Sequence, residues 1–104
     1  SHLPVLVSAA LLRTLGEQRD PNIVQLSKNL ASSGFEDTSR VGGGNPDLGT
    51  AMATYNTPAV LKALSLYRWN LEQLEGAVLS ENWKQLYAEL QNTKSIRKQY
   101  IDNS

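Results

Sequence analysis

Apolar positions recur at helical spacing along most of the chain, and no segment alternates with the period of two that predicts a strand. Residues Leu3–Leu12 are apolar nearly all round, and helix formers continue this first helix to about Glu17. From Pro58 onward, an apolar seam repeats at alternating intervals of four and three residues; it consists of Val60, Leu64, Tyr67, Leu71, Leu74 and Val78. The pattern predicts an all-α domain of about five to six helices.

Three pairs of a capping residue and a proline mark where helices begin. Asp20-Pro21, Asn45-Pro46 and Thr57-Pro58 each place an N-cap residue before a proline at the first helical position. Gly34 is expected to end the helix that starts at the first pair, as a left-handed C-cap. Gly49 costs its helix roughly 1 kcal/mol against alanine. It therefore indicates either a close neighbour or a weak helix.

A second apolar stripe predicts the last helix. Trp83, Leu86, Leu90 and Tyr100 define this stripe, and Ser80 is the expected capping residue before it. A short turn joins this helix to the one that starts near Pro58. Two helices joined in this way are expected to pack antiparallel.

The first helix predicts a partner, because it is apolar on several sides. Such a helix must be covered all round, and the short helices of a 104-residue chain supply little cover. We therefore expect a partner, which is a second copy of the chain, a missing domain, or both. With a second copy, the domain would form an intertwined homodimer. The chain opens at Ser1-His2 without a methionine, which indicates a piece of something longer.

Composition excludes several classes of site. Ten basic and ten acidic side chains cancel, so no electrostatic footprint argues for nucleic acid or an anionic membrane. Cysteine is absent and His2 is the single histidine, so we expect no disulfide and no metal site. No apolar run approaches the ~20 residues of a membrane span, and no basic segment precedes Leu3–Leu12 as in a signal peptide. We expect a cytoplasmic location.

The stretch Ser33–Pro46 interrupts the helical pattern and carries the candidate chemistry. Gly42-Gly43-Gly44 precedes a helix start, as phosphate-binding loops do. However, Asp47 stands where a dinucleotide motif needs its third glycine, no strand precedes the glycines, and no Gly-Lys-Ser/Thr tail follows. We expect a flexible turn that binds no cofactor.

Arg40 in the same stretch has two interpretations. It could form a local ion pair with the acids just upstream, which contributes little. It could also offer its planar guanidinium to a substrate carboxylate. The residues alone favour the local ion pair. His2 also has two interpretations: it is either an exposed residue at a helix start or a titratable ring in a cleft.

Three spaced motifs resemble one family. Ser1-His2-Leu3-Pro4, then Gly34-Phe35-Glu36-Asp37-Thr38-Ser39-Arg40, then Gly44-Asn45-Pro46-Asp47-Leu48 occur in the order seen in prephenate and arogenate dehydrogenases. The resemblance covers essentially residues 1–104 and matches only the C-terminal helical dimerisation domain of these enzymes of tyrosine biosynthesis. It implies that their N-terminal nucleotide-binding domain is absent from this chain.

The resemblance also implies roles for four residues. Arg40 matches the family arginine that holds a substrate carboxylate. This match reverses the preference for interpreting Arg40 as part of a local ion pair. His2 matches the histidine at the cleft between domains, and Asp37 matches the acid that orients the arginine or reaches across the dimer. Val5 departs from prephenate-specific members, which often have a second histidine there. An aliphatic residue at this specificity position implies a different substrate preference. Asn45-Pro46 together with Asp37-Thr38-Ser39-Arg40 looks more like the cyanobacterial arogenate type.

The resemblance assigns the chemistry itself to the absent domain. That domain would carry the catalytic histidine and bind NAD or NADP for the oxidative decarboxylation of arogenate or prephenate. This chain would then contain no catalytic residue and be inactive alone. Two alternatives stay open: a free-standing all-helical interaction module without a site, and a helical mutase domain. Four scattered arginines disfavour the mutase: Arg13, Arg40, Arg68 and Arg97.

Overall fold

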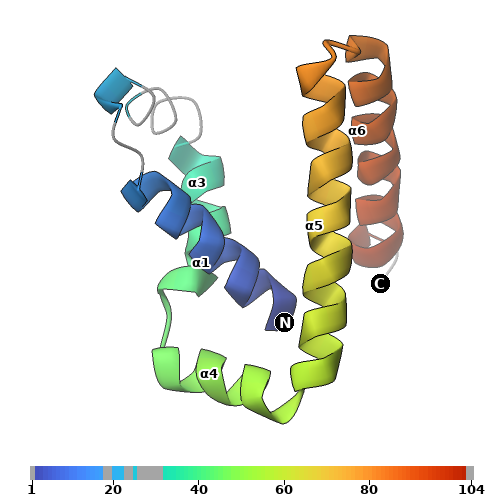
Figure 1. The fold of residues 1–104 in the computed structure, drawn as a ribbon. Helices are drawn as coiled ribbons and strands as arrows, with labels where there is room; N and C mark the ends of the chain where they lie inside the picture. Colours follow the sequence, from blue (N-terminus) through green and yellow to red (C-terminus); the bar gives the residue numbers. More distant parts are fainter. Residues whose placement is uncertain (1, 18–19, 23–24, 26–31, 103–104) are drawn as a thin grey trace. The chain divides into compact units, whose positions relative to one another are not determined.

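The chain was analysed as a computed structural model, which describes residues 2–17, 20–22, 25 and 32–102. Its α-helices are α1 (His2–Glu17), α3 (Ser32–Ser39), α4 (Pro46–Tyr55), α5 (Thr57–Leu79) and α6 (Trp83–Arg97), with a 3₁₀ turn η1 (Val41–Gly43) and a π turn η2 (Lys98–Asp102) (Figure 1). The described residues contain no strand, so the predicted all-α fold is confirmed. The chain divides into two compact units, Ser1–Ala63 and Leu64–Ser104.

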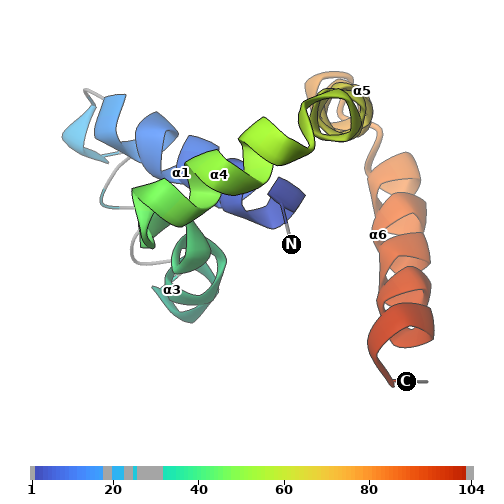
Figure 2. The same cartoon turned by 90° about the horizontal axis from the view of Figure 1, so that it is seen from below.

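In the first unit, α1 is the central element. It packs against α3, η1 and α4, and α3 also contacts η1 (Figures 1 and 2). The predicted end of α1 near Glu17 is confirmed. The helix predicted to start at Asp20 lies mostly outside the described residues, although its start is visible: the Asn22 amide donates to Asp20 Oδ1 at 3.0 Å, as an N-cap requires.

The prediction for Gly34 is wrong. This glycine lies inside α3, and no described glycine has a positive φ, so it is not a left-handed C-cap. Helix also replaces the loop expected over Phe35–Ser39. Phe35 is partly buried and α3 packs on α1, so tertiary contact outweighs the weak helix propensity of the local sequence.

The start of α4 is confirmed at atomic detail. Asn45 Oδ1 accepts a hydrogen bond from the Asp47 amide at 2.9 Å, and Pro46 occupies the first helical position. The close neighbour expected at Gly49 is also present. A Cβ added to Gly49 would lie 3.5 Å from Val5 Cγ1, so α1 and α4 approach each other at this pair.

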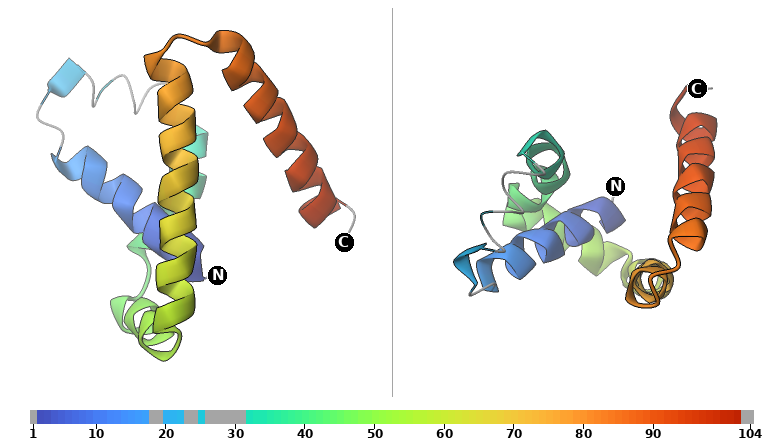
Figure 3. Two further views of the ribbon diagram at one scale, coloured as in Figure 1. Left: turned by 45° about the vertical axis from the view of Figure 1, so that its right-hand side comes forward. Right: turned by 90° about the horizontal axis from the view of Figure 1, so that it is seen from above.

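The second unit holds most of α5, the turn after it, and α6 (Figure 3). The expected capping role of Ser80 is wrong, because its hydroxyl donates back to the Gly76 carbonyl at 2.8 Å. Asn82 caps α6 instead, accepting from the Gln85 amide at 3.2 Å. Glu81 has a φ of 54°, and the Asn82 amide donates to the Ala77 carbonyl at 2.9 Å. This is a Schellman ending of α5, with a non-glycine residue in the left-handed position.

The predicted antiparallel packing of α5 on α6 is not found as an extensive contact within the single chain, where the described α6 packs mainly with η2. The seam of α5 remains largely uncovered. Val60 is buried, whereas Tyr67, Leu71 and Val78 are exposed. Large apolar side chains on α6 are exposed as well, among them Trp83 and Leu90. The intertwined dimer stays a prediction, and these faces supply apolar surface for it.

Candidate functional site

A pocket of about 250 Å³ lies in the first unit, where α1, η1 and the start of α4 meet. Its lining is small and largely apolar, and consists of Val5, Leu6, Ala9, Val41, Gly42, Gly44, Asn45, Pro46, Gly49 and Thr50. Among the residues that the structure describes, no charged side chain lines it. A charged ligand group would therefore have to be met by residues at the edge of the pocket.

Gly42 fixes η1 directly on the backbone of α1. A Cβ at this position would lie 2.5 Å from both Ala9 N and the Ser8 carbonyl carbon, closer than real Cβ contacts allow. The Gly42 amide donates to Ser8 Oγ at 2.9 Å. Ser8 is 1% exposed and is the one buried polar residue among those the structure describes. Only glycine fits here without moving one of the two elements.

Ser8 is not among the site residues predicted from the sequence. The available signal was a lone hydroxyl in the otherwise apolar segment Leu3–Leu12. A serine inside a helix usually competes with the backbone hydrogen bonds, so its presence there invites a search for a specific partner. The partner lies 34 residues away in sequence, at Gly42.

The amides of Gly42-Gly43-Gly44 are already in use. Gly42 donates to Ser8 Oγ, Gly43 donates to the Arg40 carbonyl at 3.2 Å, and Gly44 donates to the Val41 carbonyl at 3.4 Å. A phosphate cradle needs amides that point at the ligand. The turn therefore does not fit a nucleotide phosphate, which agrees with the interpretation of these glycines as a structural turn.

Arg40 joins α3 to η1 and lies next to the pocket residue Val41. Its guanidinium Nη1 is 3.8 Å from Asp37 Oδ1, and the two side chains are 75% and 76% exposed. At that distance and exposure the ion pair is loose and contributes little to stability. The guanidinium remains accessible to an incoming anion.

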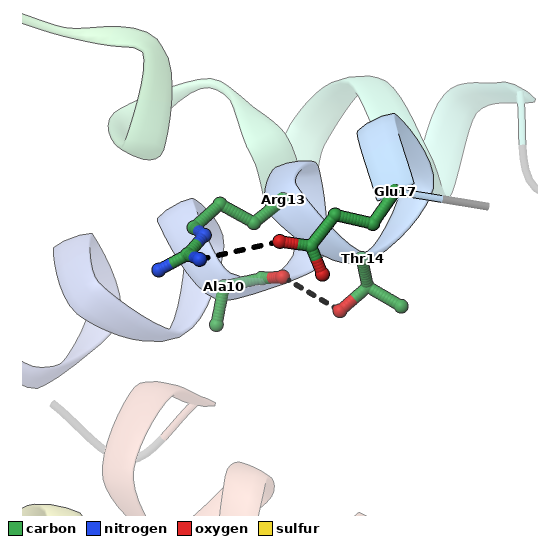
Figure 4. Close-up of polar contacts among 4 residues, drawn as sticks. All are labelled: Ala10, Arg13, Thr14 and Glu17. Carbon is green, nitrogen blue, oxygen red and sulfur yellow. Dashed lines mark hydrogen bonds and ion pairs between the residues drawn. The ribbon is translucent and has the colours of Figure 1, made fainter.

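Arg13 provides a comparison within the same unit. Its Nη2 lies 3.2 Å from Glu17 Oε1 along the exposed side of α1, and Thr14 Oγ1 donates to the Ala10 carbonyl at 2.8 Å beside it (Figure 4). This is an ordinary pairing one helical turn apart. It involves no residue of the pocket.

The structure brings some of the predicted site residues together. Val5 lines the pocket in contact with Gly49, and Asp37 pairs with Arg40, whose chain neighbour Val41 lines the same pocket. The backbone of His2 begins α1, one turn before Val5, so the two positions share a face of the helix. The side chain of His2 lies outside the described residues.

Other site types find no support among the described residues. These residues contain no group of three or more His, Asp or Glu side chains that could hold a metal ion. None of the described helices combines the length and the apolar character of a membrane span. A second hollow, of about 360 Å³, lies along α6 at Tyr87, Leu90, Gln91 and Lys94, and it includes none of the predicted site residues.

Comparisons with known proteins agree with the geometry. The crystal structure of Synechocystis arogenate dehydrogenase matches with a TM-score of 0.89 and 53% sequence identity, covering 97% of this chain. The chain spans 36% of the length of that enzyme. No curated protein matches. The family model described as "Prephenate dehydrogenase, dimerization domain" matches residues 1–92. The chain therefore belongs to the family of prephenate dehydrogenase dimerization domains.

Proposed function

We propose that residues 1–104 form the C-terminal, substrate-side and dimerisation domain of an arogenate or prephenate dehydrogenase, an oxidoreductase of tyrosine biosynthesis. The family match and the likeness to Synechocystis arogenate dehydrogenase support this proposal. The domain would act as a homodimer, joined to its own N-terminal nucleotide-binding domain. A cytoplasmic location is part of the same proposal.

One observation carries the assignment of substrate binding to this chain. An arginine with an accessible guanidinium, Arg40, directly precedes Val41, which lines a pocket with no charged side chain among its described residues. The substrates of these enzymes carry carboxylates, and a guanidinium can donate two parallel N–H bonds to one carboxylate. Arg40 would hold this group, while the small side chains of the pocket exclude water beside it.

Asp37 would orient the guanidinium before substrate arrives. The 3.8 Å separation leaves the pair weak enough for a substrate carboxylate to compete for the same N–H donors. His2 would face the cleft between the two domains of the complete enzyme, because it begins α1 on the face that carries Val5. Both roles are positional, and neither requires proton transfer by this chain.

The nicotinamide cofactor would be bound outside this chain. A dinucleotide brings a pyrophosphate, and the amides of Gly42-Gly43-Gly44 are already donated within the domain. This glycine turn therefore does not fit the pyrophosphate of NAD or NADP. The redox chemistry and the catalytic histidine would belong to the N-terminal domain, and the fragment alone would be inactive.

Arg40→Ala in the complete enzyme tests the proposal. We expect kcat/KM to fall by an amount equivalent to roughly 2–5 kcal/mol, as when one partner of a charge pair in a closed complex is lost. Steady-state kinetics with arogenate and with prephenate give the measurement. Arg13→Ala is the matched control, since it removes an equally exposed arginine from an ion pair on α1.

Unchanged kinetics of Arg40→Ala with both substrates would overturn the assigned role. Arg40→Lys refines the result, because lysine keeps the charge but loses the planar fork. We expect its loss of kcat/KM to be nearer to that of alanine than to wild type. Recovery to wild-type values would show that charge alone is needed.

Val5 is the proposed specificity position. Val5 and Gly49 both line the pocket and lie against each other, so a change of side chain at position 5 alters the shape of the pocket directly. We expect Val5→His to raise the turnover of prephenate relative to arogenate, by about fivefold or more for one added hydrogen-bonding group. The same two-substrate assay measures this ratio. An unaltered ratio would place substrate selection at other residues.

A further inference from the structure

We infer that Ser8 is a positioning residue for Arg40: its buried hydroxyl holds η1 against α1 and thereby sets where the guanidinium stands. The inference rests on the proposed function of Arg40. It starts from the contact between Ser8 Oγ and the Gly42 amide, at 2.9 Å. This side-chain hydrogen bond joins α1 to η1 across 34 residues of sequence.

The contact is tight on both sides. Ser8 is 1% exposed, and Gly42 has no room for even a methyl group against the α1 backbone. A buried amide without an acceptor is costly, so removal of the hydroxyl favours a movement of η1 that lets water or another acceptor reach it. The hydrogen bond therefore specifies one position of η1 on α1.

Arg40 belongs to the same turn as Gly42. The Arg40 carbonyl accepts from the Gly43 amide at 3.2 Å, and its backbone has helical angles, φ −55° and ψ −49°. A displacement of Gly42 is consequently transmitted to Arg40 through two peptide units and one closed turn. The exposed side chain of Arg40 is held by no burial of its own, so the backbone of η1 is its main support.

Displacement of the guanidinium would weaken substrate binding more than turnover. A two-pronged contact to a carboxylate tolerates only about half an ångström of error, whereas the chemical step is proposed to take place on the other domain. Loss of the Ser8 hydroxyl should therefore appear chiefly in KM. A general loss of folded protein would instead lower the apparent kcat and leave KM unchanged.

The test is a double-mutant cycle in the complete enzyme, with Ser8→Ala, Arg40→Ala and the double variant. We expect Ser8→Ala to raise KM by about five- to twentyfold, with kcat within about twofold of wild type. In the Arg40→Ala background, Ser8→Ala should change KM by less than about twofold, because the group it positions is gone.

A matched control lies on the same helix. Thr14→Ala also removes a hydroxyl from α1, one that donates to the Ala10 carbonyl and does not contact η1 (Figure 4). It should leave KM unchanged. If Ser8→Ala fails to fold, Ser8→Cys replaces it, since a thiol of similar size is a weak acceptor.

The outcomes separate this inference from the proposed function. If Arg40→Ala leaves KM unchanged, the proposed function fails first. If Arg40→Ala raises KM but Ser8→Ala does not, or if the two effects on KM multiply as independent changes would, the inference alone is overturned. An equal rise of KM in Thr14→Ala would also overturn it.

Discussion

The region around α1, η1 and α4 and the region of α5 and α6 are built on opposite principles. In the first, elements meet through small residues: Ser8 and Gly42 bring η1 onto the α1 backbone, and Gly49 admits Val5. In the second, large side chains point into open space, including Leu71 at 53% and Leu79 at 84% exposure. In the first region the elements contact one another directly, although Leu48 and Tyr55 on α4 are exposed. In the second region many large apolar side chains are exposed and are available for association.

The exposed side chains of α5 and α6 support this contrast. Leu66, Trp69, Leu79 and Tyr87 are among the large apolar side chains left exposed there. Their exposure is a cost that association can remove. The difference between the regions indicates that the candidate site residues lie within one compact unit, whereas the second unit offers apolar surface for the proposed dimer.

Leu71→Glu changes the exposed seam of α5 in the second region, and we expect its effect on dimer affinity to be the largest of the effects predicted here. In a twofold dimer one substitution acts twice, and each copy replaces an apolar contact by a charge that must be desolvated. We expect the dissociation constant of the dimer to rise by about a thousandfold, from the lost apolar burial alone. Sedimentation velocity over a range of protein concentrations measures this change.

Gln73→Glu is the control for that experiment. It adds the same charge to α5 two residues later, on the side of the helix away from the seam that contains Leu71. We expect the dimer to persist. If Leu71→Glu remains dimeric as well, the exposed seam of α5 is not the association surface, and the contrast between the two regions loses its explanation.

The positions of most helices, and some of their caps, could be predicted from the sequence. Where two adjacent residues carry the signal, as in Asn45-Pro46, the cap formed as expected, because capping needs only groups within one turn. Gly34 and Ser80 were misjudged because each local signal competed with another. Gly34 was overridden by the packing of α3 on α1, and Ser80 by Asn82, a better-placed cap two residues later.

The candidate site was predictable only in part, for a physical reason. Arg40 and Asp37 are three residues apart, so their pairing follows from local geometry. The partnership of Ser8 with Gly42 depends on how two elements pack in space, and no spacing in the sequence encodes it. The same holds for the approach of Val5 to Gly49, where the glycine signalled a close neighbour but could not identify it.

Gly42→Ala and Gly49→Ala sharpen the contrast within the first region, with smaller effects. Gly42→Ala should lower the free energy of unfolding by roughly 2–3 kcal/mol, because its Cβ would meet the α1 backbone at 2.5 Å and the backbone cannot rotate away. Gly49→Ala places its Cβ 3.5 Å from Val5 Cγ1, an ordinary contact, inside a helix. It should stabilise by roughly 0.5–1 kcal/mol.

Denaturant unfolding of both variants at one fixed protein concentration provides the measurement, since the stability of a dimer depends on concentration. Opposite signs for the same chemical change would show that η1 rests on the backbone of α1 while α4 only touches a side chain. If both alanine substitutions left the free energy of unfolding nearly unchanged, η1 would be able to move away from α1 at little cost. In that case the hydrogen bond from Gly42 to Ser8 could not fix the position of Arg40, and the support proposed for the substrate carboxylate would have to come from α3 instead.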